Sequence, residues 1–257
     1  MAGSPLHAQE SWQLQPLLRP LATDRPDRTE SPYSVPKGWM QVETDLVTHG
    51  EFKRTDETVT STSIGAFNLK FGLTNRMDVQ MLFTPWVRTH FQGPGIDDDE
   101  SGTGQAGLRA KFNLAGNDGG DVGAGVMPFV FIPTRGDAIF DAPTWGVLLP
   151  VSMAVTDGFA MSSMLGATRV ENEDWWVTGS VSFGTALTER FAAFLEVYVS
   201  RSGLDEDALE DVTGDVGLTF APSENWQLDA GVYYGLTDPT EDWRVFAGAS
   251  ARFDLSR

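Results

Sequence analysis

The chain has 257 residues, of which 18 are basic and 36 are acidic, so its formal net charge is −18. This charge repels polyanions, which excludes nucleic acids and anionic lipid headgroups as preferred partners. The mean hydropathy of −0.19 is too polar for a bundle of membrane helices. It does not exclude a transmembrane β-barrel, whose strands alternate lipid-facing and lumen-facing residues. The lack of cysteine excludes disulfides and thiolate metal sites.

The first 36 residues show no hydrophobic period and carry prolines at 5, 16, 20, 26, 32 and 36. Prolines at this density keep a chain extended or turning. We therefore expect residues 1–36 to form an extended periplasmic arm and residues 37–257 to form the folded domain. Residues 1–9 lack a basic start and an apolar core, so we expect a signal peptide to be absent or already removed.

From Gly38 onward apolar and polar residues alternate with a period of two, which is typical of β-strands with one apolar face. The pattern recurs about twelve times, in runs of roughly 9 to 12 residues, as in an outer-membrane barrel. In chain order the alternating residues by which these strands are recognised lie at 39–47, 66–73, 77–90, 105–112, 122–132, 147–153, 160–168, 177–183, 195–199, 212–220, 226–234 and 244–253.

Short turns alternate with longer, acidic connections between these strands. The short turns lie near residues 74–76, 156–158, 188–190 and 222–225. The longer connections hold 20 of the 36 acidic residues, and they lie at residues 50–60, 93–103, 134–144, 170–174, 201–211 and 237–242. Short periplasmic turns alternating with longer extracellular loops are characteristic of bacterial outer-membrane barrels.

The strand face opposite the apolar stripe is almost neutral but highly charged. The pattern alone leaves open which face points outward. A barrel of about twelve strands is too wide for small Val, Ala and Leu side chains to fill, whereas charge pairs and water would fill it, so we expect the apolar face outside. The charged face carries Glu43, Asp45, Asp78, Glu196, Asp215 and Asp229 against Lys70, Arg88, Arg109, Lys111, Arg244 and Arg252.

The most distinctive stretch is Thr23-Asp24-Arg25-Pro26-Asp27-Arg28-Thr29-Glu30-Ser31-Pro32, followed by Val35-Pro36-Lys37-Gly38 and by Gln41 and Glu43 on the first strand. It resembles the opening signature of the phenol-degradation meta-pathway transporter-like family, and the strand pattern fits residues 20–255. The resemblance implies an outer-membrane barrel that passes small compounds, hydrophobic or aromatic ones among them. The end of the chain departs from the usual terminal aromatic residue of such barrels, so we expect Phe253 to take that role.

Two sets of residues are candidates for the site. Basic residues facing acidic ones in the lumen would create a transverse field that selects polar solutes, and the alternative is that they form mutual ion pairs that close the interior. The lumen candidates are Glu43, Asp45, Lys70, Asp78, Arg88, Arg109, Lys111, Glu196, Asp229 and Arg244. In the arm, Asp24, Arg25, Asp27, Arg28 and Glu30 could plug the lumen, and the alternative is a periplasmic tail ordered only near residues 32–38.

No cofactor, metal site or catalytic centre is expected. The acidic runs at residues 97–100 and 205–211 lack EF-hand spacing and favour a solvated rim, and His49 and His90 favour polar rim positions. No G-x-S-x-G, Walker or dinucleotide-binding motif occurs in a suitable context. The sequence therefore predicts a non-enzymatic channel in the bacterial outer membrane, in contact with lipid and small solutes. The alternative is a non-conducting barrel with a structural or surface-binding role, and the oligomeric state cannot be read from the sequence.

Overall fold

The computed structural model describes residues 18–134, 142–171, 175–203 and 210–255. Every regular element in these ranges is a β-strand. Within them no helix has the length and apolar character needed to cross a membrane.

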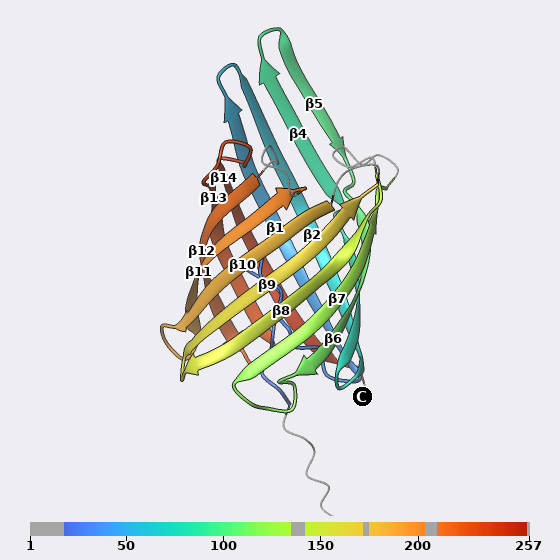
Figure 1. Ribbon diagram of the computed structural model, residues 1–257, viewed down its shortest axis with the longest axis vertical. Helices are drawn as coiled ribbons and strands as arrows, with labels where there is room; N and C mark the ends of the chain where they lie inside the picture. The colour runs from blue at the N-terminus through green and yellow to red at the C-terminus, as the bar shows by residue number, and fades with distance from the viewer. Residues whose placement is uncertain (1–17, 135–141, 172–174, 204–209, 256–257) are drawn as a thin grey trace, which may run out of the picture.

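The strands form one antiparallel sheet that closes on itself, because β1 pairs with β14 on one side and with β2 on the other (Figure 1). Strand β4 pairs with the first half of β2 and β3 with the second half. Strand β6 pairs in turn with β3, and β5 pairs with β4. The prediction of a closed barrel of about twelve strands is confirmed, with two extra strands. The strands are β1 (Trp39–Arg54), β2 (Glu57–Thr74), β3 (Met77–Phe83), β4 (Trp86–Gly93), β5 (Ile96–Gly102), β6 (Ala106–Ala115), β7 (Val122–Ile132), β8 (Thr144–Thr156), β9 (Phe159–Val170), β10 (Trp175–Ala186), β11 (Phe191–Ser202), β12 (Glu210–Ser223), β13 (Trp226–Gly235) and β14 (Trp243–Asp254).

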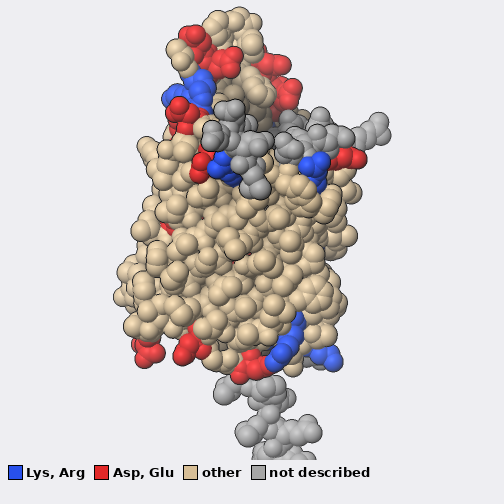
Figure 2. All heavy atoms as spheres, viewed as in Figure 1, with Lys and Arg blue, Asp and Glu red and all other residues tan. Residues whose placement is uncertain are grey.

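The apolar stripes face outward, as expected from the width of the barrel. Leu165 and Leu195 on the wall are 61% and 58% exposed, whereas the charged side chains of Lys70 and Glu196 lie inside and are almost inaccessible. Figure 2 shows the consequence on one face, where an uncharged belt separates charged side chains gathered at the two ends of the molecule. A closed barrel with an apolar belt and a charged interior has the polarity of a membrane protein.

Tryptophans mark the ends of many strands. Strands β1, β4, β10, β13 and β14 each begin at a tryptophan. The rings of Trp145 and Trp175 pack edge to face with 5.2 Å between centroids, and Trp226 packs in the same way against Phe253. These positions suit the aromatic belts that anchor barrels at the two membrane interfaces.

The prediction of long loops at residues 50–60 and 93–103 is wrong, because the structure has β-hairpins there. Residues 50–60 continue β1 and β2 into a hairpin with partners as far as Arg54 and Glu57, and residues 96–102 form β5. Both hairpins rise beyond the barrel wall at the end opposite the C-terminus (Figure 1). The alternation was missing there because a strand that leaves the membrane no longer has a lipid-facing side to keep apolar. The predicted loops at 134–144, 170–174 and 201–211, with the acidic cluster at 205–207, fall partly or wholly outside the described residues.

Arg88 does not face the lumen, which corrects its assignment as a selectivity residue. Pro85 and Trp86 are consecutive and both are exposed. The positions that face inward before this point therefore face outward after it, and the reverse. Val87 is consequently buried, while the side chain of Arg88 is 52% exposed and pairs with Asp99 on β5. That hydrogen-bonded guanidinium lowers the pKa of Asp99 below its ordinary value. An added residue in a strand reverses the side-chain parity beyond it.

The outward apolar face gives the first prediction. We expect Leu195→Arg to lower the free energy of unfolding by about 2–4 kcal/mol in lipid, because it places a charge in the hydrocarbon layer. The matched control is Leu236→Arg, since Leu236 is equally exposed at 60% but follows the end of β13. Denaturant titration in lipid vesicles measures both variants. Equal effects of the two substitutions would contradict the lipid-facing assignment.

Candidate functional site: the occupied lumen

Residues 18–36 enter the barrel from the end that carries the short turns and return to the same rim. At one end of this segment, Arg252 donates a hydrogen bond of 2.9 Å to the carbonyl of Arg19. The guanidinium of Arg19 donates in turn to the carbonyl of Asn75 at 3.0 Å. At the other end, the amide of Gly38 donates to the carbonyl of Gly72 at 3.0 Å. We call residues 18–36 the inserted arm. Because both of its ends lie at one rim, the inserted arm forms a loop within the lumen and is not threaded through it (Figure 1).

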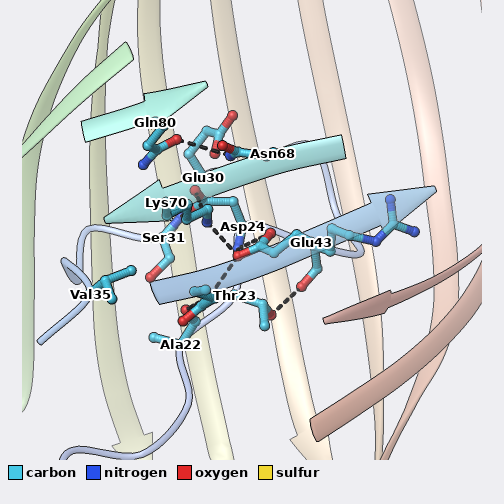
Figure 3. A network of polar contacts seen from close by, with 12 residues as sticks. Ala22, Thr23, Asp24, Glu30, Ser31, Val35, Glu43, Asn68, Lys70 and Gln80 are labelled. Atoms are coloured by element: carbon cyan, nitrogen blue, oxygen red, sulfur yellow. Dashed lines mark hydrogen bonds and ion pairs between the residues drawn. The ribbon is translucent and has the colours of Figure 1, made fainter. Parts of the chain in front are cut away.

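Asp24 is the central anchor of the inserted arm. Its carboxylate pairs with Lys111 at 2.5 Å and with Lys70, which also pairs with Glu43. Glu43 in turn accepts two hydrogen bonds of 3.0 and 3.1 Å from the amide of Asp24. Figure 3 shows Asp24 between Glu43 on β1 and Lys70 on β2. Both lysine side chains are 1% exposed, so these charges are compensated almost without water.

Arg25 reaches in the opposite direction, toward the strands that close the barrel. Its guanidinium pairs with Asp45 on β1 and with Asp229 on β13, the latter at 2.6 Å. Two carboxylates on adjoining sides of one guanidinium make strong, charge-assisted hydrogen bonds. Asp24 and Arg25 are therefore held by different groups of strands that meet at β1.

The next turn of the inserted arm rests on β11 and β6. The amides of Arg28 and Thr29 donate to the carboxylate of Glu196 at 2.7 and 2.8 Å. The guanidinium of Arg28 lies 3.6 Å from the ring centroid of Tyr198, and Glu30 pairs with Arg109 at 2.5 Å. Cation–π contact and ion pairing thus fix both charges of this turn.

Three basic residues that pair with the inserted arm come from one part of the lumen wall. Lys70, Arg109 and Lys111 lie on β2 and β6, whereas Glu43, Asp45, Glu196 and Asp229 lie on β1, β11 and β13. Asp78 is an exception, because it lies on β3 between the two basic strands. Asp24 and Glu30 of the inserted arm pair with the basic side chains, and Arg25 pairs with Asp45 and Asp229. The inserted arm therefore compensates charges on several sides of the lumen.

Glycines shape the wall to fit the inserted arm. A Cβ atom at Gly72 would lie 2.0 Å from the carbonyl oxygen of Pro36, and one at Gly248 would lie 2.1 Å from the guanidinium of Arg25. At Gly123 the nearest ring atom of Tyr33 would be 2.7 Å away. These approaches are closer than any side chain tolerates, so the wall and the inserted arm are complementary in shape as well as in charge.

A cavity of about 560 Å³ adjoins the inserted arm on the side that faces the β1–β2 hairpin. Asp24, Arg25 and Glu30 contribute to its lining from the arm. Its volume is within the range of sites that hold small organic molecules. Polar side chains such as Thr48, Ser61, Ser63 and Asn68 line part of the remainder. Aromatic residues from several strands line another part, and these are Phe67, Phe83, Phe131, Tyr233 and Phe246.

The remaining predicted residues occupy varied positions. Asp78 is fully buried and accepts a hydrogen bond of 2.8 Å from the amide of Val35. Asp27 lines the cavity, as does Arg244, which is held by Glu241 three residues earlier at 2.7 Å. In the described part of the chain, no group of three or more His, Asp or Glu side chains is arranged to hold a metal ion.

Several residues that hold the inserted arm escaped the sequence reasoning. Tyr233 donates a hydrogen bond to the carbonyl of Pro26, and Gln41 and Asn113 donate to the carbonyls of Ala22 and Pro32. Gln41 was noted in the sequence only as part of the family signature, and only its inward parity marked Asn113. The wall glycines carried no signal, because a glycine required by a close approach reads like any other glycine in a strand.

Comparison with known proteins gives a family and a fold. The family described as "Putative MetA-pathway of phenol degradation" matches residues 23–253. No curated protein matches the chain. Among solved structures, the KdgM porin is 10% identical with a TM-score of 0.52, and the match covers 84% of this chain and 99% of that one. A KdgM porin in complex with disordered oligogalacturonate gives a TM-score of 0.50 at the same identity and coverage. The toluene transporter TbuX of Ralstonia pickettii is 8% identical, with a TM-score of 0.46 and coverage of 85% and 90%.

The buried charge pairs give the second prediction. We expect Lys70→Met to lower the free energy of unfolding by about 3–5 kcal/mol, because it leaves buried carboxylates without their cation. The control is Lys53→Met, which removes a side chain that is 60% exposed and paired with Glu51. Denaturant titration of both variants in the same lipid is the measurement. An unchanged stability of Lys70→Met would show that the lysine is not buried in this network.

Proposed function

The chain belongs to the family described as "Putative MetA-pathway of phenol degradation", and from this premise and the occupied lumen we propose that it is a passive channel for small solutes. Its location is the bacterial outer membrane, where closed barrels of this polarity occur. The observation that carries the proposal is the cavity above the inserted arm, which offers a solute both aromatic surface and charged groups inside a membrane-spanning barrel. No catalytic step is part of this function.

The solutes are small molecules, hydrophobic and aromatic ones among them. Five aromatic residues line the cavity, and aromatic side chains bury ring compounds efficiently. The charged lining has five carboxylates and three arginines, and the lysines that pair with Asp24 and Glu43 bring it close to balance. The excess of acidic side chains lies on the outer hairpins, at Glu51, Glu57 and residues 97–100, and there it disfavours anions relative to cations and uncharged molecules.

The inserted arm narrows the lumen on the side of the short turns. Its ion pairs and hydrogen bonds involve β1, β2, β6, β11 and β13, so it crosses most of the interior. These contacts support the proposal that the inserted arm plugs the lumen through Asp24, Arg25, Asp27, Arg28 and Glu30. The same contacts favour a second candidate, a non-conducting barrel that the inserted arm closes permanently and that serves a structural or surface-binding role.

Single-channel recording separates the two candidates. We expect the purified full chain in planar lipid bilayers to give small, discrete current steps in potassium chloride. In a salt gradient the reversal potential should show a preference for potassium over chloride, because acidic side chains predominate on the outer hairpins. Silence from protein that circular dichroism and heat-modifiable gel mobility show to be folded would favour the closed barrel.

A change in the wall tests the inserted arm directly. We expect Gly248→Ala to increase the single-channel current, because the added methyl group would displace the guanidinium of Arg25. The matched control is Gly184→Ala on β10, where an added Cβ would meet nothing within 4 Å. Both variants are compared by their current in the same bilayers. A current that does not differ between them would contradict the narrowing role of the inserted arm.

A further inference from the structure

Four side chains that line the cavity each carry a buried polar atom without a hydrogen-bond partner in the described part of the chain. Two of these atoms are acceptors, Oε2 of Glu30 and Oδ1 of Asn68, and two are donors, Nε of Arg109 and Nε2 of Gln105. Buried polar atoms without partners are costly and rare in folded proteins. Their gathering around one cavity points to a ligand that completes their hydrogen bonds. We call these four residues the polar end of the cavity.

The strand register places the polar end around one inward position of the wall. Asn68 on β2 is aligned with Leu82 on β3, and Leu82 is aligned with Gly107 on β6. Gln105 and Arg109 lie two residues to either side of Gly107 and therefore share its inward face. Two strand spacings, about 10 Å in all, separate β2 from β6. A small ring compound can therefore contact both sides of this part of the lumen.

An aromatic ring lies between the two donors of the polar end. A Cβ atom at Gly107 would be 2.3 Å from Cε1 of Phe131, so the ring of Phe131 occupies the place of a side chain at position 107. Phe131 lines the cavity and packs against Phe129 with 5.6 Å between the ring centroids. Aromatic rings favour stacked or edge-to-face contact with other rings. The polar end thus includes a surface that suits an aromatic ligand.

Neighbouring hydrogen bonds fix the orientation of the amide of Asn68. Nε2 of Gln80 donates to Asp78 at 2.9 Å, and Oε1 of Gln80 accepts from Nδ2 of Asn68 at 3.0 Å. The atom of Asn68 that remains for a ligand is therefore the acceptor Oδ1. Figure 3 shows this hydrogen bond, with Glu30 of the inserted arm in the same part of the lumen. Glu30 pairs with Arg109 through Oε1, so the charges of these two residues compensate each other.

Two unpartnered donors, two unpartnered acceptors and balanced charge define the ligand chemistry. A carboxylate offers acceptors only and an ammonium group offers donors only, so each leaves half of the set unpaired. A hydroxyl group donates a single hydrogen bond, so a phenol leaves one acceptor unpaired. A primary carboxamide offers two N–H donors and a carbonyl oxygen with two lone pairs. This uncharged group matches the whole set.

We propose that the cavity binds uncharged aromatic carboxamides, with the carboxamide group at the polar end and the ring against Phe131. The N–H groups donate to Glu30 and Asn68. The carbonyl oxygen accepts from Arg109 and Gln105. This inference rests on the proposed channel function and deepens it, because it names one class of solute and the residues that select it. Glu30 belongs to the inserted arm, so the bound solute contacts the arm directly.

Calorimetric titration of the purified full chain in detergent tests the polar end, with benzamide as the probe. Phenol, benzoate and toluene are the comparison ligands, because they keep the ring and change its substituent. Asn68→Leu removes one acceptor, and Gln105→Glu replaces one donor by an acceptor of similar size. The matched control is Ser63→Ala, because Ser63 lines the cavity but its hydroxyl already pairs with Thr48 at 2.7 Å. Heat-modifiable gel mobility identifies the variants that are folded.

We expect benzamide to bind the unchanged chain about tenfold more tightly than phenol, and more tightly still than benzoate or toluene. Asn68→Leu and Gln105→Glu should each weaken benzamide binding about tenfold and leave toluene binding unchanged. Ser63→Ala should leave benzamide binding unchanged. Equal affinities for benzamide and toluene would overturn the inference, and so would an unaltered benzamide affinity in both folded variants.

Potassium current in planar bilayers separates the test of this site from the test of the channel. We expect saturating benzamide to lower the current of the unchanged chain, because the bound molecule fills part of the cavity. The same concentration should have less effect on Gln105→Glu. Current in a protein that does not bind benzamide would overturn the inference and leave the channel function standing. Benzamide binding by a folded protein without current would support the site and contradict the channel function.

Discussion

The pairing of charges between the inserted arm and the lumen wall is the interaction on which the rest of the structure depends. Lys70 and Lys111 approach Asp24 in an interior almost free of water, where an uncompensated charge would be very costly. A barrel wide enough for twelve strand positions cannot fill itself with its own small side chains. The inserted arm supplies the missing volume and the missing counter-charges together.

This complementarity also constrains the strands. Main-chain groups of the inserted arm bind wall carboxylates such as Glu43, Asp78 and Glu196, so these side chains hold a peptide in addition to balancing charge. Gly72 and Gly248 leave the space that the arm occupies. The reversal of side-chain parity at Pro85 and Trp86 follows a different requirement, because a strand that rises above the membrane changes its environment at the membrane boundary. The cavity is lined both by Arg25 of the inserted arm and by Thr84 next to this reversal.

The comparison of sequence and structure separates what a periodic pattern can predict from what it cannot. Strand number, closure and outward apolar faces followed from alternation and width, and the structure confirms them. Arg88 was misplaced because alternation was extended across Pro85, where the parity reverses. The upper hairpins were mistaken for loops because their strands leave the lipid and lose the one-sided pattern. Both errors arise where the environment of the chain changes from membrane to water.

The sequence by itself determined the barrel and the chemical character of its two faces, because each depends on local alternation and on the number of strands. It also supplied the alternating charges of residues 24–30, but it left equal room for a plug and a free tail. Only the tertiary structure decided that Asp24 meets Lys111, 87 residues away in the chain, and that Arg25 meets Asp229, 204 residues away. Contacts of that separation depend on how the barrel closes and on which strands face each other across the lumen, and no local pattern encodes either.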